Sequence, residues 1–347
     1  MNQHMRAIIK ETPAPGFKMT EKDVPSELKP NEVLVKILAT SICGTDVHIY
    51  KWDRWSQGRI KPPLTVGHEF SGQVVALGNA VSTIKIGDIV SAETHIVCGV
   101  CEFCREGQGH ICKETKIIGV DTDGCFADYA RMPAENLIVD RTGIDPKYLS
   151  IQEPLGNAVH TMLHFNITGK TVAVVGCGPI GLMGVNIAKA VGAAKIIAIE
   201  VNDYRLALSK KLGADICINP LKENVIKRVL EETNGLGVDV ITEFSGNKQA
   251  IEDAFKYIKN GGKMSMLGIT ESNVEVDLSK DIVFKGITIY GVIGRLMFKT
   301  WHQVHGLLAG GRLDLDQIVT HTLPLEDFEA GIELMKSGNC GKVVLIP

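Results

Sequence analysis

Four cysteines lie close together in the stretch CGVCEFCREGQGHIC, spaced as Cys98-x2-Cys101-x2-Cys104-x7-Cys112. Four thiolates are a ligand set of closed, tetrahedral structural Zn²⁺ sites, which leave no position open for a substrate. An iron–sulfur cluster also takes four cysteines, but the bacterial ferredoxin pattern has a different spacing and ends in Cys-Pro. The stretch therefore predicts a structural zinc site that ties down a lobe with little apolar core of its own.

A second set of possible ligands is dispersed along the chain: Cys43 in SICGTDVH, His68 and Glu69 in VGHEFSG, and Glu153 in QEPLGNAVH. A cysteine, a histidine and a carboxylate with one open position could form a catalytic Zn²⁺ site. Lone Cys and His residues are more often part of a core, but the Cys43 and His68 segments are glycine-flanked turns after predicted strands, where side chains can project into a cleft. The dispersed set is therefore a candidate for a catalytic zinc site.

The hexapeptide GCGPIG at 176–181 has the pattern G-x-G-x-x-G and lies between a predicted strand, 171–176, and a predicted helix, 179–191. Gly176 permits the tight turn, Gly178 lets the backbone approach a pyrophosphate, and Gly181 lets the helix pack closely on the strand. The helix N-terminus offers free N–H groups and a positive dipole end to the phosphates. This context predicts a dinucleotide-binding unit.

The next predicted strand, 195–200, ends in Glu200, 200 − 181 = 19 residues after Gly181. An acidic side chain at this spacing accepts hydrogen bonds from the adenosine ribose and repels a 2′-phosphate, which favours NAD over NADP. The alternative, a glycine turn beside a merely solvated Glu200, leaves the rest of the unit unexplained. Arg205, five residues further on, could reach the adenine ribose or cap a surface, and both interpretations stay open.

The predicted secondary structure follows two different patterns in the two parts of the chain. Up to about residue 150, short apolar runs separated by Gly, Pro and Asn predict mostly β-strands. From about residue 170, about six strands alternate with helices, which predicts an open, doubly wound parallel sheet. The last segment, 299–347, does not continue this alternation, and we expect it to fold back on the first domain.

Composition restricts the class of protein. The chain has 347 residues, enough for about two domains, with 45% hydrophobic and 22% charged side chains. A formal charge of −3 gives no overall attraction to nucleic acid or anionic lipid, and no apolar run approaches the roughly 20 residues that span a bilayer. Nine cysteines, an odd number, without a secretory signal indicate metal binding and a reducing compartment. We expect a soluble cytoplasmic protein with neither a nucleic-acid nor a membrane partner.

Together these features resemble the zinc-dependent medium-chain alcohol dehydrogenases over essentially the whole chain. The motifs are C-G-T-D-x-H at 43–48, G-H-E-F-x-G at 67–72, the four-cysteine lobe and the G-x-G-P-I-G turn. The resemblance implies an α/β protein with a GroES-like β-barrel catalytic domain and a Rossmann domain, and with substrate in the cleft between them. The expected bounds are 1–158 (with the zinc lobe at about 94–116), 159–298, and 299–347 for the segment that rejoins the first domain.

The resemblance also implies roles for single residues. Cys43, His68 and Glu69 match the catalytic-zinc positions, Thr45 and His48 match a proton relay, and Glu153 matches a carboxylate near zinc. Many relatives carry Asp at the last position, so direct ligation by Glu153 stays open. The implied NAD contacts are Ile180, Glu200, Arg205, and the backbones of Leu267, Gly268, Ile269, Ile289 and Tyr290. Homotetramers are usual among these relatives, with 287–292 as a candidate strand near an interface.

Longer strings at 42–55, 94–112, 153–161 and 294–301 look like the branch of this family that oxidises the 3-hydroxyl of L-threonine with NAD⁺. A Zn²⁺ ion lowers the pKa of bound water from about 16 to roughly 7, and nine pH units at about 1.4 kcal/mol correspond to on the order of 12 kcal/mol. If an alcohol behaves similarly, zinc dominates activation. His95 and Arg295 are candidates for binding the threonine carboxylate, and Glu153 for facing the ammonium. Ordinary polar packing of His95 and Arg295 is the equal alternative.

Other functions are less well supported. The nearest alternative is another polyol or secondary-alcohol dehydrogenase, of the butanediol or sorbitol type. A zinc-free quinone reductase would not need Cys43, His68 or the four-cysteine lobe. A zinc-module nucleic-acid binder is opposed by the lack of a basic excess. A non-catalytic relative would have no chemical reason to keep Thr45 and His48.

Overall fold

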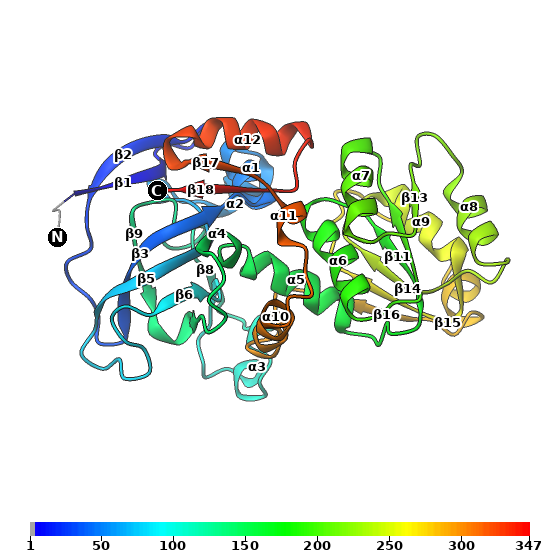
Figure 1. Ribbon diagram of the computed structural model, residues 1–347, viewed down its shortest axis with the longest axis horizontal. Helices are drawn as coiled ribbons and strands as arrows, with labels where there is room; N and C mark the ends of the chain where they lie inside the picture. Colours follow the sequence, from blue (N-terminus) through cyan, green and yellow to red (C-terminus); the bar gives the residue numbers. More distant parts are fainter. Residues whose placement is uncertain (1–3) are drawn as a thin grey trace.

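The structure, a computed structural model, describes residues 4–347 and consists of two parts joined side by side (Figure 1). The first part is rich in β-structure and contains the C-terminus, and the second is built on a parallel sheet. Helix α5 (Gln152–Leu163) lies between the two sheets (Figure 1). It runs through the expected domain boundary at residue 158, so the two parts share this helix. None of the described helices is long and apolar enough to cross a membrane.

The first part is organised around strand β3, which pairs with three other strands. Its strands are β1 (His4–Lys10), β2 (Lys18–Asp23), β3 (Glu32–Ser41), β4 (Leu64–Thr65), β5 (Glu69–Leu77), β6 (Ile89–Ala92), β7 (His95–Ile96), β8 (Lys116–Ile117), β9 (Tyr129–Pro133) and β10 (Leu137–Val139). One sheet has the order β10-β6-β5-β3-β18-β17 with β9 also on β3; smaller sheets are β2-β1-β4 and β7-β8. Because β3 is central, its successive residues Val33, Leu34 and Val35 are all buried, although their side chains point to opposite faces of the sheet.

Short helices connect these strands and carry several of the candidate residues. They are α1 (Gly44–Lys51), α2 (Arg54–Arg59), α3 (Glu102–Arg105), α4 (Pro146–Leu149), and the 3₁₀ helices η1 (Gly109–Ile111) and η2 (Ala134–Asn136). Helix α1 begins directly after β3, and α3 and η1 lie inside the four-cysteine lobe. Several candidate residues of this part therefore lie in or beside short helices.

The second part is a six-stranded parallel sheet in the order β13-β12-β11-β14-β15-β16. This is the dinucleotide-binding order 3-2-1-4-5-6, with the switch point between β11 and β14. Its elements are β11 (Thr171–Val175), α6 (Pro179–Ala190), β12 (Lys195–Ile199), α7 (Asp203–Leu212), β13 (Ile216–Ile218), α8 (Val225–Glu232), β14 (Val238–Glu243), α9 (Lys248–Tyr257), β15 (Ile258–Met266), the π-helix η3 (Leu278–Val283) and β16 (Thr288–Gly291). The predicted alternation of strands and helices is confirmed.

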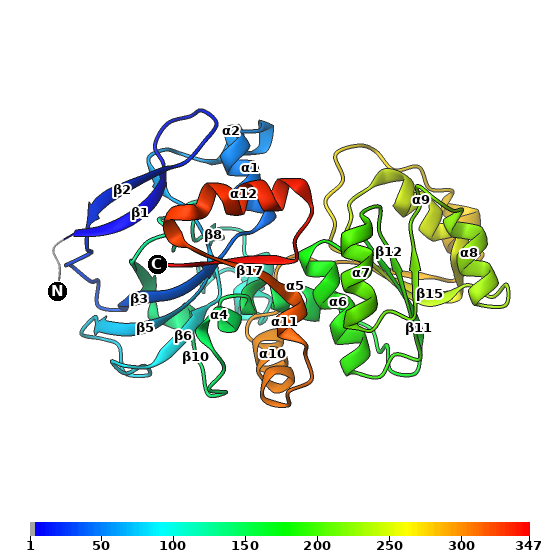
Figure 2. The same cartoon turned by 45° about the horizontal axis from the view of Figure 1, so that its top comes forward.

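Both faces of this sheet are covered, because successive side chains of a strand point to opposite sides. Val172 and Val174 belong to the core shared with α5, α6 and α7. Ala173 and Val175 belong to the core shared with α8 and α9. Figure 2 shows α6 and α7 on one side of the strands and α8 and α9 on the other.

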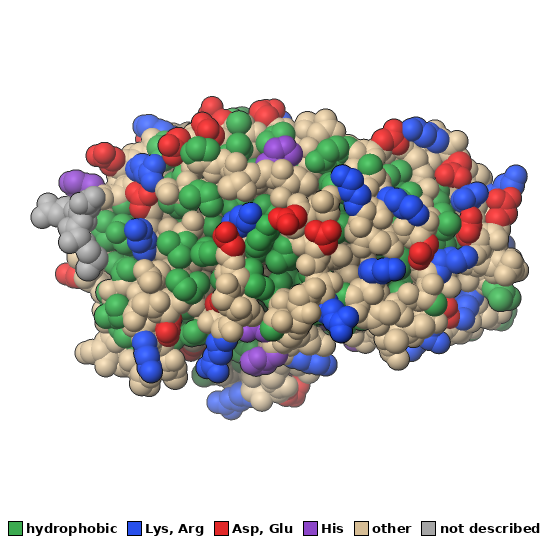
Figure 3. Space-filling view, viewed as in Figure 1, with side chains coloured by type: hydrophobic (Ala, Val, Ile, Leu, Met, Phe, Trp, Pro, Cys, Tyr) green, Lys and Arg blue, Asp and Glu red, His purple; other side chains and the backbone are tan. Residues whose placement is uncertain are grey.

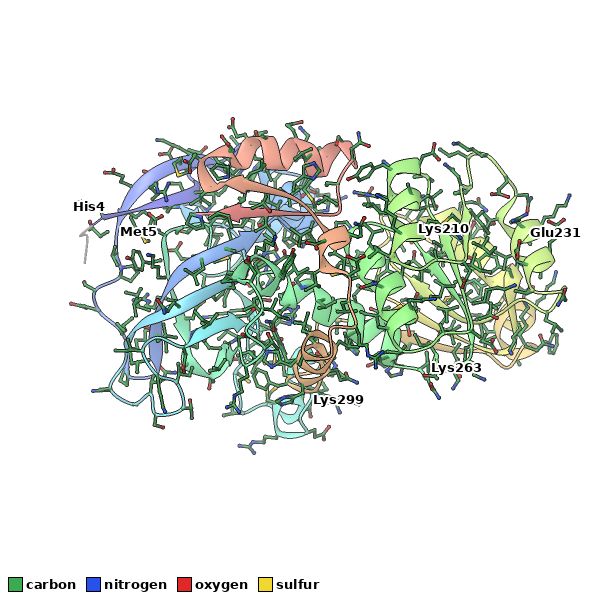
Figure 4. All side chains as sticks on the ribbon, in the orientation of Figure 1. His4, Met5, Lys210, Glu231, Lys263 and Lys299 are labelled. Atoms are coloured by element: carbon green, nitrogen blue, oxygen red, sulfur yellow. The ribbon has the colours of Figure 1, made fainter. Side chains whose placement is uncertain are left out.

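The last segment returns to the first part. It comprises α10 (Lys299–Ala309), α11 (Leu315–Ile318), β17 (Val319–Pro324), η4 (Leu325–Asp327), α12 (Phe328–Ser337) and β18 (Lys342–Ile346). Strand β18 pairs antiparallel with β3, with Val344 opposite Ser41, and parallel with β17. Helix α10, which begins at the labelled Lys299 in Figure 4, packs against α5. The return of this segment brings the C-terminal strand into the sheet that carries the candidate metal ligands.

Candidate active site and two metal centres

The dispersed ligand set forms one cluster because β3 and β5 are neighbours. Cys43 follows β3 and stands at the N-cap of α1, while His68 directly precedes β5 and Glu69 is the first residue of β5, opposite Ser41. One potential ligand atom from each of Cys43, His68 and Glu69 lies within 4.8 Å of the others. His68 and Glu69 are buried, and Cys43 is half-buried. A sulfur, an imidazole and a carboxylate thus converge at one point.

The surroundings of this cluster fit a divalent cation. Glu69 accepts hydrogen bonds through Oε2 from Ser41 and from the buried ammonium of Lys342, while its Oε1 has no partner among the described residues. Nδ1 of His68 likewise has no hydrogen bond within residues 4–347. Burial would lower the pKa of His68, but Cys43 and other acidic groups around it raise that pKa to about 10. Buried ligand atoms without partners, in surroundings that favour positive charge, are what a Zn²⁺ site requires.

Lys342 and Asp46 were not singled out from the sequence. Lys342 lies on the last strand, far along the chain from Glu69, so no local pattern marks it. Asp46 is fully buried in α1; its Oδ2 accepts the N–H of Cys43 at 2.8 Å, and its Oδ1 lies 3.8 Å from Nδ1 of His68. Asp46 could have been found from the sequence, since an acidic residue three positions after the candidate ligand Cys43 can cap the helix that begins there.

Glu153 lies outside the group of three ligand atoms. Its Oε1 accepts the hydroxyl of Thr94 at 3.2 Å and is paired with the Nη1 of Arg295. Glu153 does contribute to the negative surroundings of His68. In this structure its carboxylate is therefore a neighbour of the cluster, turned toward Arg295.

Arg295, a candidate for binding a substrate carboxylate, is engaged entirely by groups of the protein. Arg295 is 1% exposed and each of its five N–H donors has an acceptor within the protein. Nε and Nη2 donate to Glu93 and Nη2 also to Thr94, while Nη1 donates to Glu153 and to Asn157. A substrate carboxylate would have to displace one of these buried acceptors. The alternative left open by the sequence, polar packing between segments, is the one observed.

His95 stands on the short strand β7 and is half-buried. Burial, followed by the positive charge of Arg295, lowers the pKa of His95 to about 4. Its Nδ1 has no hydrogen-bond partner in the described chain. At neutral pH the ring is uncharged, so it can offer a hydrogen bond to a substrate but not an ion pair.

Thr45 and His48 lie one helical turn apart on α1. The hydroxyl of Thr45 is 3.7 Å from the sulfur of Cys43, and the exposed ring of His48 has Nδ1 2.5 Å from Oδ2 of Asp53. Asp53 also accepts the backbone N–H of Ser56 as the N-cap of α2. Although burial opposes it, the hydrogen bonds from Ser56 and His48 lower the pKa of Asp53. Asp53 was missed from the sequence, although an Asp before the run RWSQ is typical of an N-cap.

The four-cysteine lobe has the geometry expected of a metal centre. The sulfurs of Cys98, Cys101, Cys104 and Cys112 all lie within 4.8 Å of one another. Backbone N–H groups point at them: those of Cys98 and Glu114 at Cys112 and that of Cys101 at Cys98, each at 3.4 Å. None of the cysteines in residues 4–347 forms a disulfide. Donors aimed at sulfur suit thiolates that ligate a metal.

Each position of the G-x-G-x-x-G turn differs in why a glycine fits there. Gly176 has φ of 84°, and a Cβ on Gly181 would lie 2.0 Å from the carbonyl oxygen of Gly176. A Cβ on Gly178 would meet only Nη1 of Arg205, at 4.0 Å. Helix α6 begins at Pro179 without a side-chain cap, which leaves its first N–H groups free for phosphate. The turn is thus packed on the sheet side and open at Gly178.

Glu200 and Arg205 flank this turn. The carboxylate of Glu200 accepts the N–H of Cys177 at 2.8 Å and that of Asn202 at 3.0 Å. The guanidinium of Arg205 lies near Gly178 and Gly338, and its buried Nε has no partner in the described residues. This position, between the glycine turn and the loop before β18, favours a role at the dinucleotide turn over a surface cap. Leu267, Gly268 and Ile269 follow β15, Ile289 and Tyr290 lie in β16, and Ile180 is on the first turn of α6.

Comparison with known proteins gives the class of the chain. Residues 29–140 match the alcohol dehydrogenase GroES-like domain and residues 179–310 match the zinc-binding dehydrogenase family. The chain belongs to the zinc-dependent medium-chain alcohol dehydrogenase family. It is 52% identical to an L-threonine 3-dehydrogenase from Caldanaerobacter subterraneus, over 100% of both chains. Other curated L-threonine 3-dehydrogenases match at 48–53% identity over nearly the whole chain.

Solved structures of the same fold are less similar in sequence. A 2R,3R-butanediol dehydrogenase from Bacillus subtilis has a TM-score of 0.89 at 28% identity, with 99% of each chain covered. An alcohol dehydrogenase from Escherichia coli complexed with NADH has a TM-score of 0.91 at 28% identity, with 100% of each chain covered. The expected fold class is therefore confirmed.

Proposed function

We propose that this protein oxidises the 3-hydroxyl of L-threonine with NAD⁺, giving 2-amino-3-oxobutanoate and NADH. The observation that carries the reaction class is the buried convergence of Cys43, His68 and Glu69 in the molecule that also carries the glycine turn. The substrate is supported by the 52% identity, over the full length, to an L-threonine 3-dehydrogenase. A butanediol-type activity is the second candidate, but the solved butanediol dehydrogenase is only 28% identical.

A catalytic Zn²⁺ ion would be held by Cys43, His68 and Glu69. A Zn²⁺ ion bound there supplies the acidity of the substrate hydroxyl, a contribution on the order of 12 kcal/mol if an alcohol responds as water does. Thr45, close to the sulfur of Cys43, takes the hydroxyl proton. His48, exposed on the same helix, passes it toward solvent, and Asp53 fixes its ring by binding Nδ1.

The second part binds and orients the dinucleotide. The free N–H groups at the start of α6 and the open face of Gly178 receive the pyrophosphate, and Glu200 receives the ribose hydroxyls. Because Arg295 is occupied, we assign threonine recognition to the neutral ring of His95 in place of Arg295. Holding the reacting atoms of cofactor and substrate in one orientation is a large part of the rate enhancement.

Three further assignments belong to this proposal. We assign residues 1–158 and 299–347 to a catalytic domain and 159–298 to a dinucleotide domain, joined through α5. A homotetramer is supported by the exposed edge strand β16, on which Ile289 is 37% exposed, beside Phe284 at 81%. Nine free cysteines support a cytoplasmic location, and the formal charge of −3 argues against a nucleic-acid partner. Figure 3 shows acidic as well as basic side chains on both parts of the molecule.

A substrate panel tests the proposal. NADH production is measured with L-threonine, 2,3-butanediol and sorbitol, before and after treatment with a metal chelator. We expect the highest kcat/KM with L-threonine and loss of activity on chelation. Preference for a diol, or full activity after the cluster metal has been removed, would overturn the assignment.

A further inference from the structure

Glu243 ends strand β14 and its side chain is fully buried. Its carboxylate accepts the backbone N–H groups of Ser245 at 2.8 Å and Gly246 at 3.0 Å, and also the hydroxyl of Ser245. Burial raises the pKa of Glu243, and the groups that oppose this shift are hydrogen bonds, with no cationic side chain among them. A buried carboxylate held only by neutral donors is costly, so a specific geometric role is the natural reason for its position.

The same residue joins two loops. The backbone carbonyl of Glu243 accepts the N–H groups of Leu267 at 2.9 Å and Gly268 at 3.2 Å. A Cβ on Gly268 would lie 2.4 Å from the carboxylate of Glu243 and 2.2 Å from the backbone nitrogen of Gly246. The turn after β14 and the loop after β15 are therefore in direct backbone contact around this one side chain.

A third loop meets the same point. A Cβ on Gly176, the first glycine of the dinucleotide turn, would lie 2.8 Å from both the backbone nitrogen and the Cβ of Ser245. The loops after β11, β14 and β15 thus converge where Glu243 binds its donors. They leave the carboxyl ends of neighbouring parallel strands, which is the edge at which such sheets bind dinucleotides.

We propose that Glu243 is a positioning residue for the dinucleotide. Its carboxylate fixes the turn at 243–246, and this turn holds the glycine turn at 176 on one side and the loop at 267–269 on the other. It acts through the backbone of these loops, without touching the substrate. This inference rests on the proposed function only in assuming that the protein binds NAD.

Asp239 offers a matched control, because it lies near the other end of the same strand. Its Oδ2 accepts the N–H of Thr171 at 2.8 Å, and its Oδ1 pairs with Lys259. It therefore fastens the sheet at the edge opposite the cofactor. A change at Asp239 should affect stability but not the loops around Gly176 and Gly268.

The test compares Glu243→Gln with Asp239→Asn by NADH fluorescence titration, steady-state kinetics and thermal unfolding. In Glu243→Gln the acceptor loses its negative charge, and the amide nitrogen replaces Oε2, which accepts only the longer bond from Gly246 at 3.3 Å. Hydrogen bonds to a neutral acceptor are weaker than those to a charged one, so we expect the NADH dissociation constant to rise about tenfold. The KM for L-threonine should change less than about twofold, since the metal cluster is untouched. Asp239→Asn should lower the thermal midpoint and leave NADH binding unchanged.

Ser245→Ala serves as the second variant, since Ser245 is exposed and its loss should not prevent folding. It removes one donor to Glu243, and we expect about threefold weaker NADH binding. Wild-type NADH affinity in Glu243→Gln, or in Ser245→Ala if the former does not fold, would overturn the inference. So would equal weakening in Asp239→Asn. A wild-type protein that binds NADH without oxidising L-threonine would refute only the proposed substrate, and the dissociation constants would still decide the role of Glu243.

Discussion

Replacement of Arg295 by Met removes a buried cation while keeping a long side chain in its place. Arg295 joins Glu93 and Glu153, both buried, and all five of its donors are used. After the change, these two carboxylates share a buried site without a cation. Loss of one partner from a buried ion pair typically costs about 3–5 kcal/mol of stability. We therefore expect Arg295→Met to be strongly destabilised at pH 7.

The pKa of Glu93 gives the same magnitude independently. Burial would raise it, but the charge and hydrogen bonds of Arg295 lower it from 4.5 to about 2. At roughly 1.4 kcal/mol per pH unit, this difference corresponds to about 3 kcal/mol. Because the folded pKa lies below the unfolded value, this stability is present above about pH 4.5 and is lost as the pH falls toward 2.

The pH dependence of the variant should have the opposite sign. Without Arg295, burial dominates and raises the pKa of Glu93 above 4.5. A raised folded pKa means that stability is present at low pH and is lost as the pH rises. The deficit of Arg295→Met relative to wild type should therefore be largest at pH 7 and shrink toward pH 4.

Urea unfolding at several pH values measures this deficit. Trp301 reports on the site, because its indole N–H donates to Glu93 at 2.8 Å. Arg131→Met is the matched control: Arg131 is 44% exposed and pairs with Glu32 at 3.4 Å, so its loss should cost less than about 1 kcal/mol. If Arg295→Met were as stable as Arg131→Met and only raised the KM for L-threonine, Arg295 would be a substrate ligand and the reasoning would be refuted.

Three further predictions concern the metals, the cofactor and the proton relay. Cys43→Ser should lose one of two zinc ions per chain together with activity, whereas Cys104→Ser should lose the other and unfold at lower temperature; elemental analysis and thermal scans distinguish them. Glu200→Ala should shift the ratio of kcat/KM for NAD⁺ over NADP⁺ at least about tenfold toward NADP⁺, and an unchanged ratio would contradict its assignment. Asp53→Asn should lower kcat about tenfold without changing NADH affinity, because the ring of His48 loses its fixed orientation; wild-type kcat would exclude that role.

The parts of the molecule that could be predicted from the sequence are those defined by local patterns. The helix expected at 179–191 is α6, Pro179–Ala190, because the turn and the apolar spacing that specify it are contiguous. The four-cysteine lobe is equally local, and its sulfurs converge as expected. Cys43 and His68 are separated along the chain, yet each follows a strand, so pairing of β3 with β5 was enough to bring them together.

The partners of buried charges could not be predicted, because they come from distant segments. Glu93 is 202 residues from Arg295 in sequence. Nothing in the residues around Arg295 indicates that its guanidinium binds a carboxylate of the protein. An arginine near a substrate site looks the same in sequence whether it faces the cavity or a protein carboxylate. The packing of α5 on β5 and β6, with α10 on α5, decides between them.

Lys342 is a second partner from a distant segment, and it pairs with Glu69 of the candidate metal cluster. Glu69 is buried, and Lys342 is the only cationic side chain among the described residues that forms an ion pair with it. Lys342 stands on β18, which reaches Glu69 only because the last segment pairs with β3. An unpaired carboxylate at that depth would be costly. The carboxylate of Glu69 is therefore paired only when the C-terminal strand has docked, so the return of residues 299–347 is required for the candidate metal site as well as for the sheet.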